Sequence, residues 1–149
     1  MSDQPLHYLD TSAVLRWLLE GSSDLTALEG HRSVASSRLL WTEVARALHR
    51  GLQTDRLTPA SAAAAQHRFA ALATRIARIE LAEPVLRRAE GPFPVVVRSL
   101  DAIHLASAEK WLESESPTAY PAALHLWSTD TRMNQCAALL GFTTPLNRT

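Results

Sequence analysis

Short apolar segments alternate with longer helix-forming ones along this chain, and that alternation restricts the fold more than any other feature. It predicts strands at residues 6–9, 33–36, 78–81 and 124–127, with a last edge strand at 142–144. It predicts helices at 13–20, from Ser37 to about 50, from Thr58 to about 74, at 84–90, from Ser99 to about 113, and at 131–140. Strands separated by helices favour an α/β fold, with a central parallel sheet of four or five strands and helices on both faces. Because segments 6–9 and 124–127 are the most apolar, we expect them at the centre of the sheet.

Turn and cap residues mark the ends of these helices. Ser37 and Ser99 are expected to cap helices, and Thr58 followed by Pro59 is a cap with a first-turn proline. Glycine marks the expected ends of three helices: Gly21, Gly51 and Gly141.

Length and cysteine content limit the class of protein. A chain of 149 residues suits a single domain, here residues 1–149, which buries enough surface to fold without a disulfide or structural metal. Cys136 is the only cysteine, as expected in a reducing compartment, and its place in a helix suggests a small core residue. Asp3 comes early and no apolar segment resembles a signal peptide or a membrane span. We therefore expect a cytoplasmic protein.

The balance of charge restricts the possible partners. Fifteen basic and fifteen acidic residues give a net charge of zero, which argues against a protein that coats nucleic acid, and we expect no direct DNA binding. Lys110 is the only lysine, so the other 14 basic residues are arginines. Arginine suits phosphate recognition, but a compositional bias would give the same excess.

Four carboxylates occupy positions that direct them to one edge of the predicted sheet. Asp10 and Asp130 each follow a strand expected at the sheet centre, and Asp101 begins a helix at the head of an apolar stripe. Glu43 lies within the first two turns of its helix, beside the apolar face. Strand C-termini and the first turns of the following helices meet at one edge of a doubly wound sheet, where ligands bind.

Three of the carboxylates also have a structural interpretation when they are taken alone. Asp101 and Asp130 are in the right places to cap a helix or to complement its dipole. Glu43 could be a solvated side chain that pairs with Arg46 or Arg50 at helical spacing.

Taken together, the carboxylates predict a metal site. Several carboxylates at one edge repel each other unless a cation neutralises them, and oxygen ligands favour Mg²⁺ or Mn²⁺ over zinc. The hydroxyls of Thr11, Ser12 and Thr129 could orient the carboxylates or bind water there. Such a site suits hydrolysis of a phosphodiester, in which the cation activates water and stabilises the leaving oxygen.

The order and surroundings of these residues resemble the PIN domain family, most closely the VapC-type toxins of prokaryotic toxin–antitoxin pairs. The resemblance covers nearly the whole chain and is carried by YLDTSAVLRWL (Asp10), SRLLWTEVARAL (Glu43), RSLDAIHLASA (Asp101) and LWSTDTRMNQCAALLGF (Asp130). No segment is specific alone; their order and spacing together are. The family varies most at its fourth carboxylate, which here is Asp130.

The resemblance implies a PIN-like α/β/α sandwich and an endoribonuclease that uses Mg²⁺ or Mn²⁺ to cut RNA such as tRNA or rRNA at few sites. It implies that Asp10, Glu43, Asp101 and Asp130 are the catalytic and metal-binding residues. It also implies a homodimer and a small antitoxin protein that occupies the active site.

Other residues could contribute contacts. Four arginines near the acidic segments could bind RNA phosphates or an antitoxin: Arg16, Arg46, Arg98 and Arg132. The tryptophans could stack on bases, but their positions favour core packing: Trp17, Trp41, Trp111 and Trp127. No pair of histidines has the spacing of a helical zinc site. His104 lies one turn after Asp101 and could form a hydrogen bond near it, although a packing role is the simpler interpretation.

Two other functions are compatible with parts of this sequence. One is a catalytically silent PIN-like module that only binds a protein partner, against which the four retained acidic positions argue. The other is a phosphoacceptor receiver-like domain. Receiver-like domains need a lysine after a late strand, whereas Lys110 lies in the middle of a predicted helix.

Overall fold

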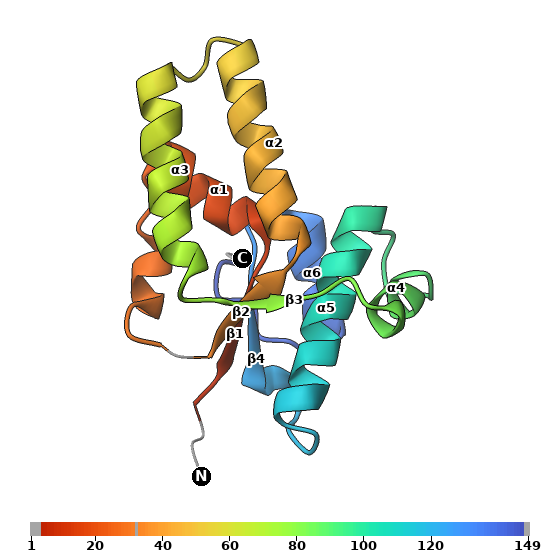
Figure 1. The fold of residues 1–149 in the computed structure, drawn as a ribbon. Helices are drawn as coiled ribbons and strands as arrows, with labels where there is room; N and C mark the ends of the chain where they lie inside the picture. Colours follow the sequence, from red (N-terminus) through yellow and green to blue (C-terminus); the bar gives the residue numbers. More distant parts are fainter. Residues whose placement is uncertain (1–3, 32, 148–149) are drawn as a thin grey trace.

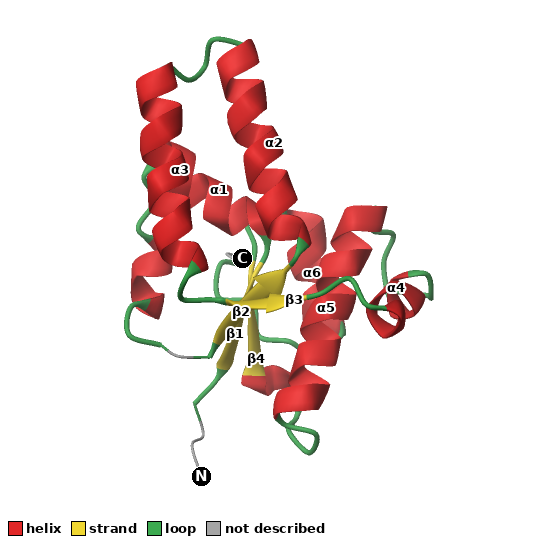
Figure 2. Ribbon diagram, viewed as in Figure 1, coloured by secondary structure: helices red, strands yellow, loops and turns green. Residues whose placement is uncertain are grey.

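The computed structural model describes residues 4–31 and 33–147, and Figures 1 and 2 show its arrangement. Four strands are formed: β1 (Leu6–Leu9), β2 (Val34–Ser37), β3 (Ala77–Ile79) and β4 (Leu124–Trp127). The α-helices are α1 (Thr11–Glu20), α2 (Leu39–Gln53), α3 (Pro59–Ala73), α4 (Glu83–Ala89), α5 (Ser99–Glu115) and α6 (Thr131–Leu139). Two short 3₁₀ helices complete the order: η1 (Asp24–Leu28) and η2 (Pro121–Ala123).

The strands form one parallel sheet in the order β3-β2-β1-β4. The expectation that 6–9 is central is confirmed, but 124–127 ends the four-strand order rather than lying at its centre. The expected edge strand at 142–144 is reduced to one bridge between Thr143 and His125. This segment still covers the outer edge of β4 through two backbone hydrogen bonds, which explains why β4 is apolar in spite of its position.

Helices cover both faces of the sheet, so the predicted α/β/α arrangement is confirmed (Figure 2). Successive strand residues point to opposite faces. Leu9 and Val34 pack with α1, α2 and α3, whereas Tyr8 and Leu126 pack with α5 and α6. Cys136 is buried in the second of these cores, as expected.

The tryptophans also pack as predicted. Trp111 and Trp127 are buried, and the other two, Trp17 and Trp41, are partly buried against the α1–α3 side of the core. None of the helices in residues 4–31 and 33–147 combines the length and hydropathy that a membrane crossing requires.

Local signals place most helix ends correctly. Thr58 forms a reciprocal capping box with Ser61 ahead of Pro59, and Gly21 ends α1 in the left-handed conformation. Some of the expected helix boundaries were wrong by a few residues. Gly51 lies inside α2, which continues to Gln53; a Cβ there would lie 2.5 Å from the Leu57 side chain, so close packing explains this glycine.

The start of α5 also differs from the prediction. Ser99 is the first residue of this helix and does not cap it; Arg98 holds the cap position, without a side-chain hydrogen bond to the helix. The helix also runs two residues further than predicted, to Glu115.

Candidate active site

Asp10 directly follows the central strand β1 and is only 5% exposed. Ser12 and Ser128 both donate hydrogen bonds to its Oδ2, at 2.6 and 2.8 Å. Asp10 also precedes α1, but its side chain makes no capping hydrogen bond to that helix. The carboxylate is therefore held by two hydroxyls and makes no hydrogen bond to the N-terminus of α1.

The two serines also join the segments that follow β1 and β4. The Ser12 hydroxyl accepts a hydrogen bond from the Thr129 amide at 3.0 Å, and the Ser128 hydroxyl accepts one from the Asp130 amide at 3.0 Å. Ser128 was not predicted from the sequence. Its hydroxyl orients a carboxylate, which is the role expected of the Thr129 hydroxyl, while Thr129 contributes its backbone amide.

Glu43 lies on α2, with its side chain 27% exposed. Thr11 donates a 2.8 Å hydrogen bond to its Oε1, and Nε2 of His104 lies 2.8 Å from the same oxygen. Burial raises the pKa of Glu43, but the contacts with His104 and Thr11 outweigh burial and hold that pKa below its usual value. Among the described residues Glu43 makes no ion pair with Arg46 or Arg50, so the solvated alternative does not describe it.

Asp101 lies in the first turn of α5, with its side chain 25% exposed. Burial raises its pKa, and the negative charges of Asp10 and Asp130 raise it further. Arg98, 3.9 Å from its Oδ2, acts in the opposite direction. Asp101 is therefore near enough to the other two aspartates for their charges to repel.

Asp130 is the N-cap of α6, because its Oδ1 accepts a 2.9 Å hydrogen bond from the Met133 amide. The expectation that Asp130 caps the helix after it is thus confirmed. It does not exclude a second role, since the charge of Asp130 also acts on Asp101. We call the set of Asp10, Glu43, Asp101 and Asp130 the carboxylate edge.

His104 takes a larger part in this edge than the packing role expected of it from the sequence. It is 1% exposed, and its Nε2 lies 2.8 Å from Glu43 and 3.9 Å from Oδ1 of Asp10. Its other ring nitrogen contacts the Tyr8 hydroxyl at 2.8 Å. The signal in the sequence was its spacing of one helical turn from Asp101, but both partners lie far away along the chain.

The four arginines named from the sequence are all exposed. Arg16 pairs with acidic residues near the end of its own helix, and Arg98 pairs with Asp101. Within the described part of the chain, Arg46 and Arg132 make no ion pair. These last two guanidinium groups are therefore available to an anionic ligand.

The carboxylate edge fits a hard divalent cation by its chemistry, because it offers carboxylate and hydroxyl oxygens whose negative charges repel. The geometry is more open than a finished metal site. In residues 4–31 and 33–147, no three or more His, Cys, Asp and Glu side chains are grouped so that they could hold a metal ion.

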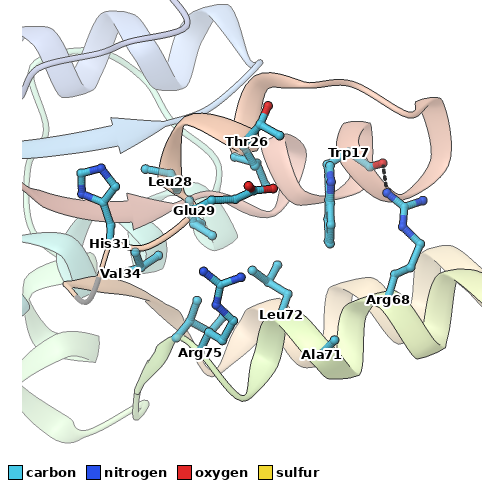
Figure 3. Close-up of a pocket in the computed structure, with 13 residues that line it drawn as sticks. Trp17, Thr26, Leu28, Glu29, His31, Val34, Arg68, Ala71, Leu72 and Arg75 are labelled. Atoms are coloured by element: carbon cyan, nitrogen blue, oxygen red, sulfur yellow. Dashed lines mark hydrogen bonds between the residues drawn. The ribbon is translucent and has the colours of Figure 1, made fainter.

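A separate apolar pocket of about 230 Å³ lies between α1, η1 and α3 (Figure 3). Trp17, Leu28 and Leu72 line it, with Arg68 and Arg75 beside them. No residue of the carboxylate edge contributes to its wall. The apolar pocket and the candidate active site are therefore different places in the molecule.

The fold is an α/β/α sandwich with a buried aspartate after an inner strand and further carboxylates at the same edge, which belongs to the class of α/β domains that place ligand sites at the carboxyl ends of their strands. A model of the PIN domain family matches residues 7–115, and the chain belongs to this family. PIN domains are typically nucleases that use divalent metal ions. The match includes Asp10, Glu43 and Asp101, while Asp130 lies beyond it.

Comparison with solved structures gives the same fold. A chain in the crystal structure of VapBC2 from Rickettsia felis, bound to a DNA fragment from their promoter, superposes with a TM-score of 0.56 and 11% identity. The match covers 88% of this chain and 92% of that chain. No curated protein sequence matches significantly.

Proposed function

We propose that the chain is a Mg²⁺- or Mn²⁺-dependent endoribonuclease that acts as the toxin of a toxin–antitoxin pair. The observation that carries the proposal is Asp10: a buried carboxylate at the carboxyl end of the central strand, fixed by two hydroxyls and making no capping hydrogen bond to α1. Burying a charge in this way is costly unless a ligand or partner charge compensates it. Membership of the PIN family supports nuclease chemistry at this position.

Each residue of the carboxylate edge has a proposed role that follows from its contacts. Ser12 and Ser128 orient Asp10, so that its Oδ1 faces the site. Asp101 approaches from the first turn of α5, and Glu43 from α2. Asp130 keeps α6 in place and adds negative charge.

When bound, a divalent cation would supply an activated water and charge stabilisation for the leaving oxygen. Asp10, Asp101 and Glu43 would hold it, with Asp130 as the fourth candidate ligand. Arg46 and Arg132, exposed and without ion pairs in the described residues, would bind backbone phosphates of the RNA.

The assignment to toxins, and to RNA as substrate, rests on the resemblance to VapC-type proteins and is supported by the fold shared with a chain of the VapBC2 structure. We propose structured RNA, such as tRNA or rRNA, as the substrate. We also propose a homodimer, and a small antitoxin that covers the carboxylate edge.

The test is to incubate the purified protein with total bacterial RNA and Mn²⁺ and to map new 5′ ends. Asp101→Asn should abolish these ends without loss of folding, because it removes a carboxylate that its neighbours repel. Glu83→Gln is the matched control: Glu83 is 68% exposed, and within residues 4–31 and 33–147 its one ion pair is with Arg87 on the surface. New ends that EDTA and Asp101→Asn both remove, and that Glu83→Gln keeps, support the proposal.

The opposite result would assign the chain to the silent binding module. It would consist of no new ends at any Mn²⁺ concentration, together with no measurable binding of Mn²⁺ to the wild-type protein. New ends that persist in Asp101→Asn would instead indicate a contaminating ribonuclease.

A further inference from the structure

His104 uses both of its ring nitrogens inside the protein. It lies on α5 at 1% exposure, beside the apolar residues of that helix. Nδ1 lies 2.8 Å from the Tyr8 hydroxyl, and Nε2 lies 2.8 Å from Oε1 of Glu43. The imidazole therefore connects a residue of the central strand to a carboxylate on α2.

The direction of these hydrogen bonds follows from Glu43 and Tyr8. A carboxylate only accepts hydrogen bonds, so Nε2 of His104 is the donor to Oε1 of Glu43, and a neutral imidazole then has its lone pair on Nδ1. Thr11 Oγ1, which gives its own proton to Glu43, lies 3.1 Å from the same Nε2 and agrees with a donor there. The Tyr8 oxygen accepts a hydrogen bond from the Ser37 amide at 3.1 Å, and its hydroxyl, which is protonated at neutral pH, is the donor to Nδ1.

Glu43 is held through one oxygen only. Its Oε1 accepts from Thr11 at 2.8 Å as well as from His104, whereas within the described residues Oε2 has no hydrogen bond. His104 also lies between two carboxylates of the edge, since its Nε2 is 3.9 Å from Oδ1 of Asp10. The arrangement fixes one Glu43 oxygen to the protein and leaves the other for a cation or water.

We propose that His104 is a positioning residue for the carboxylate edge, with its tautomer set by Tyr8 and its Nε2–H orienting Glu43. The inference rests on the proposed function, because it assigns Glu43 to the metal-binding side of that site. Partners that orient a metal ligand from behind commonly change metal affinity or activity by about 10- to 100-fold when they are replaced.

Two variants separate the two ends of the imidazole. His104→Gln places an amide near the position of Nε2, so it can still donate to Glu43 while losing Tyr8. His104→Asn places its amide near Nδ1, so it can still accept from Tyr8 while losing Glu43. A purely structural role predicts similar behaviour from both, because each fills the site with a polar amide.

The experiment measures Mn²⁺ affinity by calorimetry and kcat and KM for RNA cleavage, with thermal stability as the control for folding. We expect His104→Asn to lose about 10- to 100-fold in Mn²⁺ affinity or kcat with KM little changed, and His104→Gln to remain near the wild type. Equal losses in the two variants would overturn the proposal.

A second arm needs no activity. Long-range proton–nitrogen NMR of the wild-type protein reports which imidazole nitrogen carries the proton. We expect the Nε2–H tautomer at His104, and a changed signal in Tyr8→Phe, which removes the donor to Nδ1. An Nδ1–H tautomer would contradict the inference. If the wild-type protein neither binds Mn²⁺ nor cuts RNA, the proposed function fails, and the NMR result alone decides whether His104 holds Glu43.

Discussion

Two buried histidines on opposite faces of the same sheet show how differently one residue type can be used. His104 is satisfied at both nitrogens, by Tyr8 and Glu43. His7, on β1, accepts a 3.1 Å hydrogen bond from Trp127 at Nδ1, but among the described residues its Nε2 has no partner. His104 therefore belongs to a hydrogen-bond network at the carboxylate edge, whereas His7 leaves an unpaired polar atom in the core.

The side chains around His7 disfavour its protonated form. The rings of His31 and His125 approach it edge-on, with centroids 4.8 and 5.2 Å away. We call these three residues the histidine cluster. Burial, followed by the neighbouring charges of His125 and His31, lowers the pKa of His7 to about 4. The histidine cluster is not arranged to bind a metal ion through His7. The hydrogen bond from Trp127 to Nδ1 places the proton of neutral His7 on Nε2, and a nitrogen that binds a metal needs a free lone pair.

This contrast indicates that a buried polar side chain points to function only when the groups it contacts belong to a candidate site. His104 lies against two carboxylates, Glu43 and Asp10, whereas His7 lies against two more imidazoles. We therefore expect the carboxylate edge to control activity and the histidine cluster to control stability.

The largest effect is expected at the carboxylate edge. Asp10→Asn can still accept hydrogen bonds from Ser12 and Ser128, so we expect a folded protein with unchanged thermal stability. It loses the buried charge, and its RNA cleavage should fall by about 100-fold or more, measured as the initial rate with Mn²⁺. An Asp10→Asn protein that unfolds at a lower temperature but keeps its cleavage rate would show that the carboxylate edge serves stability rather than activity.

The next effect is on stability and belongs to the histidine cluster. The pKa of His7 is about 4 in the folded protein against 6.5 unfolded, so the unfolded chain takes up the proton first as the pH falls. The free energy of unfolding therefore begins to fall near pH 6.5, has fallen by about 2 kcal/mol at pH 5, and stops falling near pH 4.

Urea unfolding of the wild type and of His7→Asn at pH 7.5 and pH 5 measures this contribution. The asparagine can accept from Trp127 but does not titrate, so its stability should fall less between the two pH values. Equal losses in both proteins would show that His7 is not the acid-sensitive group. Nuclease rate at pH 7.5 should be similar in both.

A smaller effect divides the two roles of Asp130. Asp130→Ala removes the cap of α6 and should cost about 1 kcal/mol of unfolding free energy, whereas Asp130→Ser keeps a capping oxygen and should cost little. Comparing their rates then isolates the charge. A stable Asp130→Ser protein with wild-type rate would limit Asp130 to helix capping, and one with a strongly reduced rate would make it part of the site.

The sequence predicted the parts of this molecule that depend on local rules. Strand and helix alternation, the Thr58–Pro59 cap and the glycine that ends α1 each depend on neighbours within a few residues. The position of β4 depends instead on a distant segment. The apolar character of a strand does not reveal that Thr143 lies along its outer edge and covers it. Gly51 was misassigned for the same reason, since its contact is with a loop residue rather than with a helix end.

At the candidate site, the sequence predicted carboxylates but not their supports. Ser128 and His104 act through partners more than 90 positions away, Asp10 and Tyr8 respectively, and a single sequence contains no record of such pairs. Asp101 could be placed by its helix position alone. The acids are visible from strand and helix order, whereas the groups that orient them become visible only in three dimensions.

A calorimetric titration of Mn²⁺ into wild-type protein and Asp10→Asn measures whether the carboxylate edge binds a divalent cation. We expect saturable binding to the wild type that Asp10→Asn abolishes or greatly weakens, while Glu83→Gln binds as the wild type does. Binding that is equal in wild type and Asp10→Asn, or absent from both, would show that the carboxylate edge is not a cation site.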